Sequence, residues 1–300
     1  MTYTIAHFSD THVLSLKDAR FEDFLNKRFT GAVNLVLNRG RHYRTEVFEA
    51  VLDAITECAP DHVVCTGDLV NLALQAEFDK VKELLAQHFE PAKLTIVPGN
   101  HDYYVKQAME LGHFEQTFAQ YIPKTSNGKT YPFVRDLGDV VLVGLCSAIE
   151  QPVFFAGGRI GDEQLEEMSR LLSLPKYQDK FKIVLVHHPL LPDPERRMEF
   201  TRQLADAESL IHTFWMLGDD APQMVLNGHN HRYRRCVLPG TEIVNVQAAS
   251  ASRFGGHHPA EFNLYQITGQ SLSRIERRIF DSDHFKRVVA YEGIEVEEGT

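Results

Sequence analysis

Five short segments rich in Asp, Asn and His follow predicted strands, and they constrain the fold more than any other feature of the chain. The segments are "FSDTH" (8–12), "TGDLVN" (66–71), "PGNHD" (98–102), "VHHP" (186–189) and "NGHNH" (227–231). Each follows a short, apolar run rich in β-branched residues, which is typical of a buried strand. Side chains that could bind metals or transfer protons therefore recur at one kind of place, the carboxyl end of a strand.

The runs before these segments alternate with amphipathic stretches, and this alternation predicts an α/β fold. Helices are expected at 45–59, 76–89 and 161–174, and strands at 3–9, 61–66, 93–97, 139–146, 182–186 and 223–227. After residue 230 the pattern changes to antiparallel strands, expected at 234–240, 241–250, 261–268 and 271–280. No repeat or low-complexity linker interrupts the chain, so we expect a single domain over residues 1–300. In open α/β sheets the binding crevice lies outside the carboxyl ends of the strands, so the five segments should meet there.

Composition and charge narrow the class of protein. Hydrophobic residues make up 43% of the 300 positions and charged residues 24%, as in a soluble globular chain. The formal net charge of −10 argues against binding to extended nucleic acid. The first twelve residues lack the pattern of a secretory signal, and no apolar run is long enough to span a bilayer. Four cysteines without a CxxC pair suggest a reducing compartment, so we expect a cytoplasmic protein.

The five segments offer more ligands than one tetrahedral metal ion can use. The candidates are Asp10, His12, Asp68, Asn100, His187, His229 and His231. A tetrahedral zinc site takes four ligands, whereas this set suits two divalent ions if one carboxylate bridges them. Asp68 is the natural bridge, because its loop is central in the motif order. Imidazole, carboxylate and amide donors together favour Mn²⁺, Fe or Zn²⁺ over Ca²⁺.

Two such ions predict hydrolysis at phosphorus. Ions about 3.5–4 Å apart can clamp the attacking and leaving oxygens of an in-line displacement, with a metal-bridging hydroxide as the nucleophile. His101 directly follows Asn100 and is not needed as a ligand. It could donate a proton to the leaving oxygen or hold a phosphoryl oxygen as charge develops.

The ordered set "SDTH", "GDLVN", "GNHD", "HHP" and "GHNH" closely resembles the calcineurin-like binuclear metallophosphoesterases. It looks most like their class III cyclic-nucleotide phosphodiesterase branch, which the segment "VNVQAASASRFGGHHPAEFNLYQI" (244–267) also resembles. The resemblance implies a four-layer αββα sandwich with the site at the top of the paired sheets. It also implies that His101 is the catalytic histidine.

The resemblance further implies which residues hold each metal. One ion would be bound by Asp10, His12, Asp68 and His231, and the other by Asp68, Asn100, His187 and His229. His188 stands beside His187 and could be confused with it, but the family pattern favours His187.

Several polar residues near the motifs have more than one interpretation. Asn71 could cap the following helix or hold a phosphoryl oxygen. Asp102 is expected to orient His101 or to cap the next helix. His257 and His258 lie in "FGGHHP", as part of a solvated loop or of the wall of a substrate pocket. Trp215, between Phe214 and Met216 in a helical stretch, is expected in the core.

Residues 21–44 do not follow from the phosphoesterase core. This insert carries five basic residues (Lys27, Arg28, Arg39, Arg41 and Arg44) among apolar ones. It could be a surface helical hairpin packed on the core. Alternatively, its basic and apolar groups could meet an anionic lipid or a membrane surface.

We therefore predict a metal-dependent phosphoesterase that acts on phosphodiesters, with a small-molecule phosphodiester or nucleotide as substrate. The stretch "NKRFTGAVN" (26–34) resembles an insert of metallophosphoesterases that cleave the pyrophosphate of UDP-2,3-diacylglucosamine. A pyrophosphohydrolase acting on a UDP-linked lipid, peripheral to the membrane, is the alternative. A non-enzymatic scaffold is disfavoured because no ligand of the set is missing.

Overall fold

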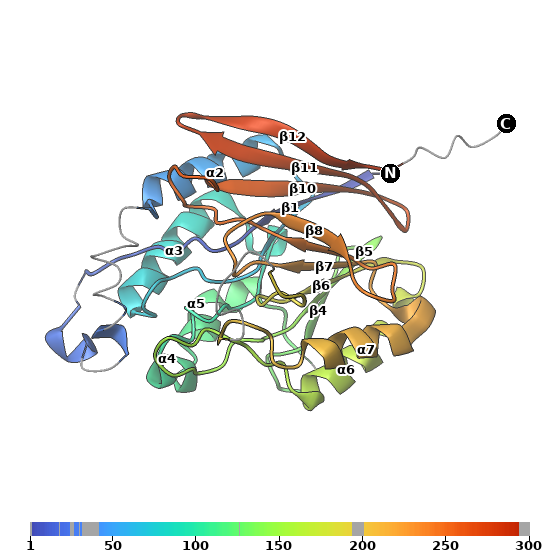
Figure 1. Cartoon of the computed structure of the whole chain (residues 1–300), viewed down its shortest axis with the longest axis horizontal. Helices are drawn as coiled ribbons and strands as arrows, with labels where there is room; N and C mark the ends of the chain where they lie inside the picture. Colours follow the sequence, from blue (N-terminus) through green and yellow to red (C-terminus); the bar gives the residue numbers. More distant parts are fainter. Residues whose placement is uncertain are drawn as a thin grey trace.

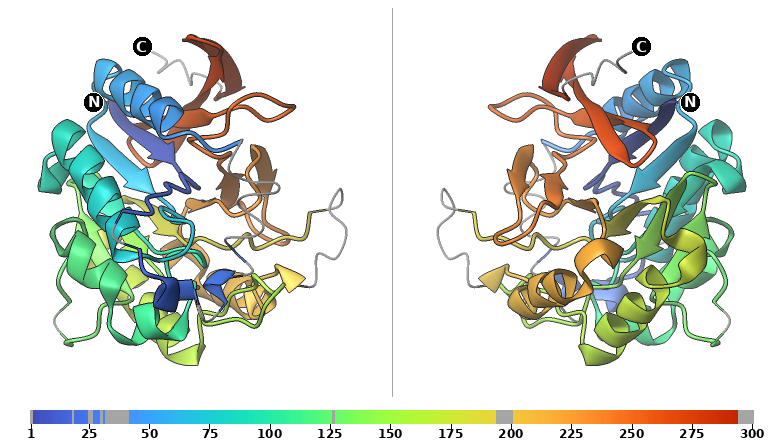
Figure 2. Two further views of the ribbon diagram at one scale, coloured as in Figure 1. Left: turned by 90° about the vertical axis from the view of Figure 1, so that its left-hand side faces the viewer. Right: turned by 90° about the vertical axis from the view of Figure 1, so that its right-hand side faces the viewer.

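The computed structural model describes residues 2–17, 19–24, 27–29, 31, 42–125, 127–193 and 201–293. Among these residues the strands form two six-stranded sheets that face each other, with helices on the outer faces (Figure 1, Figure 2). The predicted αββα sandwich is confirmed. Within the described ranges, no helix combines the length and apolar character needed to cross a bilayer.

The first sheet has the strand order β12-β11-β10-β1-β2-β3. β1, β2 and β3 are parallel, and β10 continues the sheet antiparallel to β1. Its strands are β1 (Thr2–Phe8), β2 (His62–Cys65), β3 (Leu94–Ile96), β10 (Glu261–Thr268), β11 (Ser271–Asp281) and β12 (His284–Glu292). The parallel strands deliver the segments 8–12, 66–71 and 98–102 to one edge.

The second sheet has the order β4-β5-β6-β7-β9-β8, with β5, β6, β7 and β9 parallel and the outer strands antiparallel. Its strands are β4 (Phe133–Asp136), β5 (Val140–Gly144), β6 (Phe181–Leu185), β7 (Met224–Asn227), β8 (Arg234–Val237) and β9 (Val244–Gln247). Segments 186–189 and 227–231 follow β6 and β7. A parallel bridge between Ser9 and Ser250 links the ends of the two sheets at this edge.

The helices cover the outer faces of the sheets. They are α2 (Thr45–Glu57), α3 (Gln75–His88), α4 (Lys106–Glu110), α5 (His113–Phe118), α6 (Asp162–Leu172) and α7 (Ala207–Leu217). Short 3-10 turns are η1 (Phe21–Phe24), η3 (Pro91–Lys93), η4 (Ala119–Tyr121), η5 (Pro175–Tyr177) and η7 (Gly218–Asp220). α6 and α7 lie side by side under the second sheet (Figure 1).

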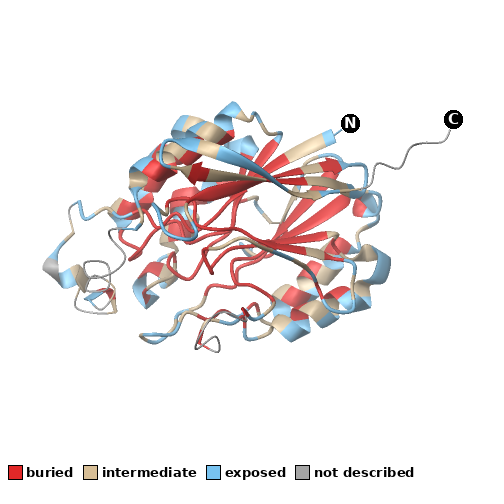
Figure 3. Ribbon diagram, turned by 45° about the horizontal axis from the view of Figure 1, so that its top comes forward, coloured by how far each residue is buried: buried red, intermediate tan, exposed pale blue. Residues whose placement is uncertain are grey.

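Strand alternation divides the apolar residues of the second sheet between the two larger hydrophobic clusters. Val140 and Leu142 of β5 belong to the larger cluster, which joins both sheets with α2, α3 and α5. Val141 and Val143 belong to the smaller cluster, which packs against α6 and α7. Because successive side chains of a strand point to opposite faces, β5 is buried on both. Figure 3 shows the central strands of both sheets buried, whereas the outer helix faces and the outermost strand β12 are largely exposed.

The structure corrects one expectation about the core. Trp215 is 60% exposed, whereas the neighbouring Phe214 is buried in the smaller cluster. Adjacent residues of a helix lie about 100° apart around its axis, so only one face of α7 can reach the sheet. Burial of Phe214 therefore does not imply burial of Trp215, the next residue in the sequence.

Candidate metal centre

All five ligand-bearing segments converge at one edge, and their backbone there is unusual. Five of the expected ligands have positive φ: Asp10 (56°), His12 (44°), Asp68 (53°), His229 (74°) and His231 (56°). The left-handed region is uncommon for residues other than glycine, and such conformations concentrate at functional sites. These conformations occur in the turns that follow β1, β2 and β7.

Glycines allow these turns to approach each other closely. A Cβ built on Gly99 would lie 2.3 Å from Asp68 Oδ1, and one on Gly228 would lie 2.5 Å from Asp10 Oδ2. Only glycine leaves room for the two carboxylates at these distances. Gly99 of "PGNHD" thus leaves space for Asp68, and Gly228 of "NGHNH" leaves space for Asp10, each a candidate ligand from another loop.

The first cluster contains Asp10, His12, Asp68 and His231, which together offer ligand atoms within 4.8 Å of one another. His231 Nε2 lies 3.2 Å from Asp10 Oδ1 and 3.0 Å from His12 Nε2. All four residues are buried. These are the residues expected for the first metal ion, and the structure brings them together.

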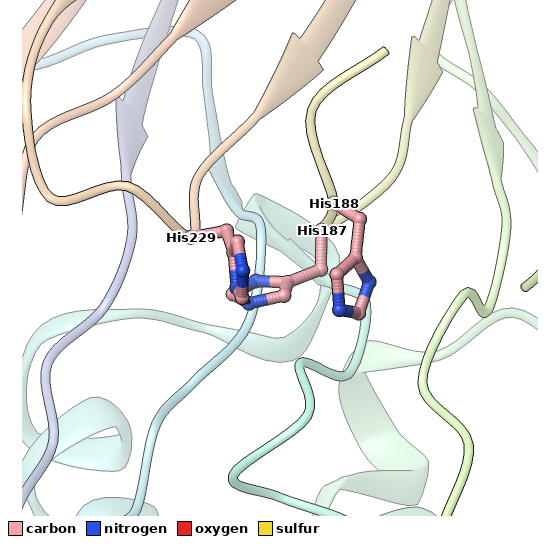
Figure 4. A group of neighbouring side chains, drawn as sticks. All are labelled: His187, His188 and His229. Atoms are coloured by element: carbon pink, nitrogen blue, oxygen red, sulfur yellow. Dashed lines mark hydrogen bonds between the residues drawn. The ribbon is translucent and has the colours of Figure 1, made fainter. Parts of the chain in front are cut away.

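The second cluster contains His187 and His229, whose facing atoms Nε2 and Nδ1 lie 3.2 Å apart. Figure 4 shows these two rings directed toward each other. The Nδ1 atom of His187 donates a hydrogen bond to the carbonyl oxygen of Thr66 (2.7 Å). The lone pair of the neutral ring therefore lies on Nε2, the atom that faces His229.

Asp68 lies between the two clusters. Its Oδ2 atom is 3.7 Å from His12 Nε2 and 3.4 Å from His187 Nε2. Its other oxygen accepts a hydrogen bond from the backbone N–H of His101 (2.7 Å). One carboxylate oxygen thus faces both clusters, which is the position that a bridging ligand requires.

His188 lies close to His187 and His229, but its two ring nitrogens are bonded to other groups. Its Nε2 atom donates to the carbonyl oxygen of Ala156 (3.1 Å), and its Nδ1 atom accepts from the hydroxyl of Ser147 (2.8 Å). Burial and the neighbouring His187 lower the pKa of His188 to about 3, so the ring is neutral. Both nitrogens of His188 are thus bonded within the protein, which opposes a role as a metal ligand although the ring lies beside His187 and His229.

His101 lies beside the first cluster. Its ring is 4.8 Å from the ring of His12, edge to face, and it stacks on Tyr104 at 5.3 Å. The Nδ1 atom of His101 donates to the carbonyl oxygen of Asn71 (2.7 Å). This bond sets the ring orientation and makes Nε2 the atom available for proton transfer in chemistry at the site.

Asn71 does not cap the following helix, because α3 begins at Gln75 with Leu74 at the N-cap position. Its side-chain amide nitrogen instead donates to the backbone carbonyl of His12, and its backbone carbonyl accepts a hydrogen bond from His101 Nδ1. Asn71 therefore connects a metal-binding loop to the candidate acid.

The structure also corrects the expected roles of Asp102. Its carboxylate accepts hydrogen bonds from the backbone N–H groups of Asp68, Leu69 and Gly99 at 2.8 to 2.9 Å, and from Val70 at 3.2 Å. It neither contacts the His101 ring in these bonds nor caps α4. Asp102 holds the second and third ligand loops in register with each other.

The remaining candidates lie farther out. His257 and His258 are exposed in the loop between β9 and β10. Of the insert, residues 25, 26, 30 and 32–41, which include Arg39 and Arg41, lie outside the described residues. Arg28 is only 5% exposed and donates to the carbonyl oxygens of Leu72 and Ala73 at 2.8 and 2.6 Å. One of the basic groups of the insert therefore anchors it to the core.

The electrostatics favour a bound cation. Burial opposes ionisation of Asp68, but His187, His101 and His12 hold its pKa well below the usual range. Burial likewise opposes charge on His187, yet the Asp68 carboxylate raises its pKa to about 9. The buried carboxylate thus attracts positive charge, and a divalent ion can replace the proton on His187.

One buried atom provides an independent test of the fit. Asn100 Oδ1 is buried and, within the described ranges, has no hydrogen-bond partner. Such a group is costly unless something binds it. Asn100 Oδ1 is the amide oxygen expected to be a ligand. The donor set of imidazole, carboxylate and amide therefore fits two divalent ions, with Asp68 between them.

A family profile described as "Calcineurin-like phosphoesterase" matches residues 3–233. The chain is a calcineurin-like phosphoesterase. The match includes all five ligand segments and confirms the family resemblance. A comparison with curated protein sequences found no significant match.

Solved structures resemble this phosphoesterase over nearly its whole length. A dimetal phosphatase from Danio rerio superposes with a TM-score of 0.65 at 11% identity, covering 96% of this chain and 98% of the other. The purple acid phosphatase PPD1 from yellow lupin superposes with a TM-score of 0.62 at 14% identity, covering 95% of this chain and 53% of the other. At these identities the likeness shows a shared fold.

Two side chains of the phosphoesterase that hold histidines of this region could not be predicted from the sequence. Ser147 binds His188, and Tyr43 binds His231 with Oη 2.6 Å from Nδ1. Neither belongs to a motif, and Tyr43 is 188 positions from its partner. Only the folded chain shows these contacts.

Proposed function

We propose that this phosphoesterase hydrolyses phosphodiester bonds in small molecules, with a cyclic nucleotide as the model substrate. The observation that carries the proposal is the position of Asp68 Oδ2 between two clusters of metal-binding side chains. The resemblance of the ordered motifs and of residues 244–267 to cyclic-nucleotide phosphodiesterases supports the diester preference.

The residues of the two clusters would hold two divalent ions, which supply a nucleophile activated near neutral pH and positive charge for the phosphoryl oxygens. Asp68 fixes the spacing of the two clusters. The backbone carbonyl oxygen of Asn71 orients His101, so that His101 Nε2 can deliver a proton to the leaving oxygen. Asp102 keeps the loops of Asp68 and His101 in register, which preserves this geometry.

A comparison of diester and monoester substrates tests the proposal. Mn²⁺-loaded protein would be given cyclic AMP, bis-p-nitrophenyl phosphate and p-nitrophenyl phosphate in parallel, with product analysis by mass spectrometry. We expect turnover of both diesters above that of the monoester. Hydrolysis of the monoester alone would overturn the diester assignment, and Asp68→Asn provides the background from contaminating hydrolases.

A UDP-linked lipid is the second candidate substrate, and the insert supports it. Phe29 is 61% exposed, and Leu16, on the segment leading into the insert, is 55% exposed. Lys27 Nζ lies 4.6 Å from the ring centroid of Tyr104, which stacks on His101. Exposed apolar groups and a cation next to the candidate acid are the features that an anionic lipid head group would use.

Vesicle flotation separates this candidate from the first. Binding to phosphatidylglycerol vesicles should fall in Phe29→Asp and persist in Met216→Asp, a matched change at a 67% exposed residue of α7. The same preparations would be offered UDP-2,3-diacylglucosamine. Vesicle binding with turnover of the lipid alone would favour the second candidate, and turnover of cyclic AMP without vesicle binding would favour the first.

We also propose that the protein works in a reducing compartment such as the cytoplasm. All four cysteines (Cys58, Cys65, Cys146 and Cys236) are free thiols. Reduced thiols persist where glutathione and thioredoxin operate. Extended nucleic acid is not proposed as a partner, because a net charge of −10 opposes neutralisation of many phosphates.

A further inference from the structure

The hydroxyl of Tyr43 contacts a ligand of the first cluster from behind. Tyr43 Oη lies 2.6 Å from His231 Nδ1, while Nε2 of the same ring faces Asp10 Oδ1 at 3.2 Å. The two nitrogens of His231 therefore point in different directions, one into the cluster and one to the phenol. A histidine that binds a metal through Nε2 carries its proton on Nδ1 and can donate it to such an oxygen.

The ring of Tyr43 also packs on the cluster. Its centroid is 5.0 Å from that of His12 at an interplanar angle of 63°, and 5.6 Å from that of His231 at 88°. Edge-to-face contacts of this kind are favourable between aromatic rings. One side chain from outside the motifs thus touches two of the four residues of the first cluster.

The backbone around Tyr43 is held in place by the segment after β9. Phe254 N–H donates to the carbonyl oxygen of His42 (2.7 Å), and Arg44 N–H donates to that of Ser252 (3.0 Å). The guanidinium of Arg44 lies 3.8 Å from the ring centroid of Phe254. These contacts fix Tyr43 on both sides before any metal binds, and a fixed partner orients a ligand better than a mobile one.

We propose that Tyr43 is a positioning residue of the metal centre, whose hydroxyl accepts the Nδ1 proton of His231 and so directs the Nε2 lone pair into the first cluster. The inference rests on the metal-dependent activity proposed above. It assigns the insert a function at its C-terminal end, where residues 42–44 support the cluster that contains His231.

The test removes one oxygen atom. Tyr43→Phe keeps the ring and its packing on His12 but removes the acceptor for His231. Loss of a partner behind a metal-binding histidine typically weakens metal affinity by about 10–100-fold. Calorimetric titration of metal-free protein with Mn²⁺ should show this loss at one of two sites. The absorption spectrum of the Co²⁺ form should change as well.

Tyr265→Phe is the matched control. The Tyr265 hydroxyl is also bonded to a histidine Nδ1, that of His7, at 2.9 Å, but His7 belongs to neither cluster. This control should keep wild-type Mn²⁺ affinity at both sites. His231→Ala marks which calorimetric site is the first cluster, because it removes a ligand there.

Activity distinguishes positioning from catalysis. In Tyr43→Phe the Mn²⁺ concentration needed for half-maximal turnover should rise, while kcat at saturating Mn²⁺ stays near the wild-type value. Wild-type Mn²⁺ affinity at both sites in Tyr43→Phe would overturn the inference. Wild-type protein that binds two ions yet turns over no phosphoester would overturn the proposed function instead, so the two failures can be told apart.

Discussion

The two metal-binding clusters orient their histidines by different means. In the second cluster, His187 Nδ1 donates to a backbone carbonyl, that of Thr66. In the first, His231 Nδ1 faces the side chain of Tyr43, from a distant part of the chain. A backbone carbonyl is present whatever side chain its residue carries, whereas a phenol can be lost in one substitution. The first cluster should therefore respond more readily to changes in the residues around it.

The largest loss of turnover and of bound metal is expected at Asp68, because its Oδ2 atom faces both clusters. Asp68→Asn weakens the negative charge that faces both His12 and His187. Metal-ion catalysis contributes several kcal/mol, so turnover should fall by about 10³-fold or more. Native mass spectrometry should show fewer than two ions per chain. Asp136→Asn, at a surface carboxylate paired with Lys180, should change neither quantity. Retention of both ions and full turnover would contradict the bridging position.

An effect on turnover without loss of metal is expected at His101, which touches the first cluster without belonging to it. His101→Ala should lower turnover by about 10²–10⁴-fold, the usual contribution of a general acid or base. Both ions should remain bound, since His101 contacts the first cluster by ring packing. Metal content and the pH profile of kcat would be measured together. Loss of an ion from this variant would show that His101 is a ligand.

The adjacent histidines of "VHHP" sharpen the comparison further. His187→Ala should lose one ion, whereas His188→Ala should keep both, because the nitrogens of His188 are bonded to Ser147 and Ala156. Leaving these buried partners unpaired should cost about 1–3 kcal/mol of unfolding free energy. Mn²⁺ titration and urea unfolding of both variants check this. Loss of an ion from His188→Ala would place it in the second cluster.

The strands that carry the site were predictable because each combines an apolar run with a polar turn. β4 and β12 were missed, and both are outermost strands of their sheets. β12 carries His284, Lys286 and Arg287 and is largely exposed, so it lacks the apolar pattern of a buried strand. Charged residues on an edge strand hinder its pairing with other chains, which accounts for the charges on β12. The same charges interrupt the apolar pattern from which a strand is predicted.

Within the site, residues close to a strand end were predictable from the sequence, whereas contacts between residues far apart in the chain were not. The ligand candidates could be found because each lies within a few residues of a strand end. The role of Asp102 was mistaken because its four hydrogen-bond donors include groups more than thirty positions earlier. The contact of Tyr43 depends on pairing between residues 42–44 and 252–254, which no local pattern indicates. The side chains that cluster at the site were therefore predictable from the sequence, and the groups that orient them were not.

The smallest effect concerns histidines that belong to neither cluster. His62 is bonded to the hydroxyl of Thr95 (2.8 Å), and His7 lies between Thr66 and Tyr265. Burial lowers the pKa of each to about 3. In the unfolded chain these rings titrate near 6.5, so between pH 6.5 and 3 the unfolded state binds more protons than the folded state. Stability should therefore decrease as pH falls below 6.5, by up to about 1.4 kcal/mol per pH unit for each ring.

Metal-free protein isolates this effect, because protons also compete with metals for the ligand histidines. Urea unfolding of EDTA-treated protein would be measured between pH 7.5 and 5 for the wild type, His62→Gln and His284→Gln. The first variant removes one buried ring and should reduce the slope of stability against pH. The second changes a side chain that is 62% exposed on β12 and should leave the slope unchanged. Equal slopes in all three proteins would show that His62 accepts a proton in the fold, which its buried bond to Thr95 opposes.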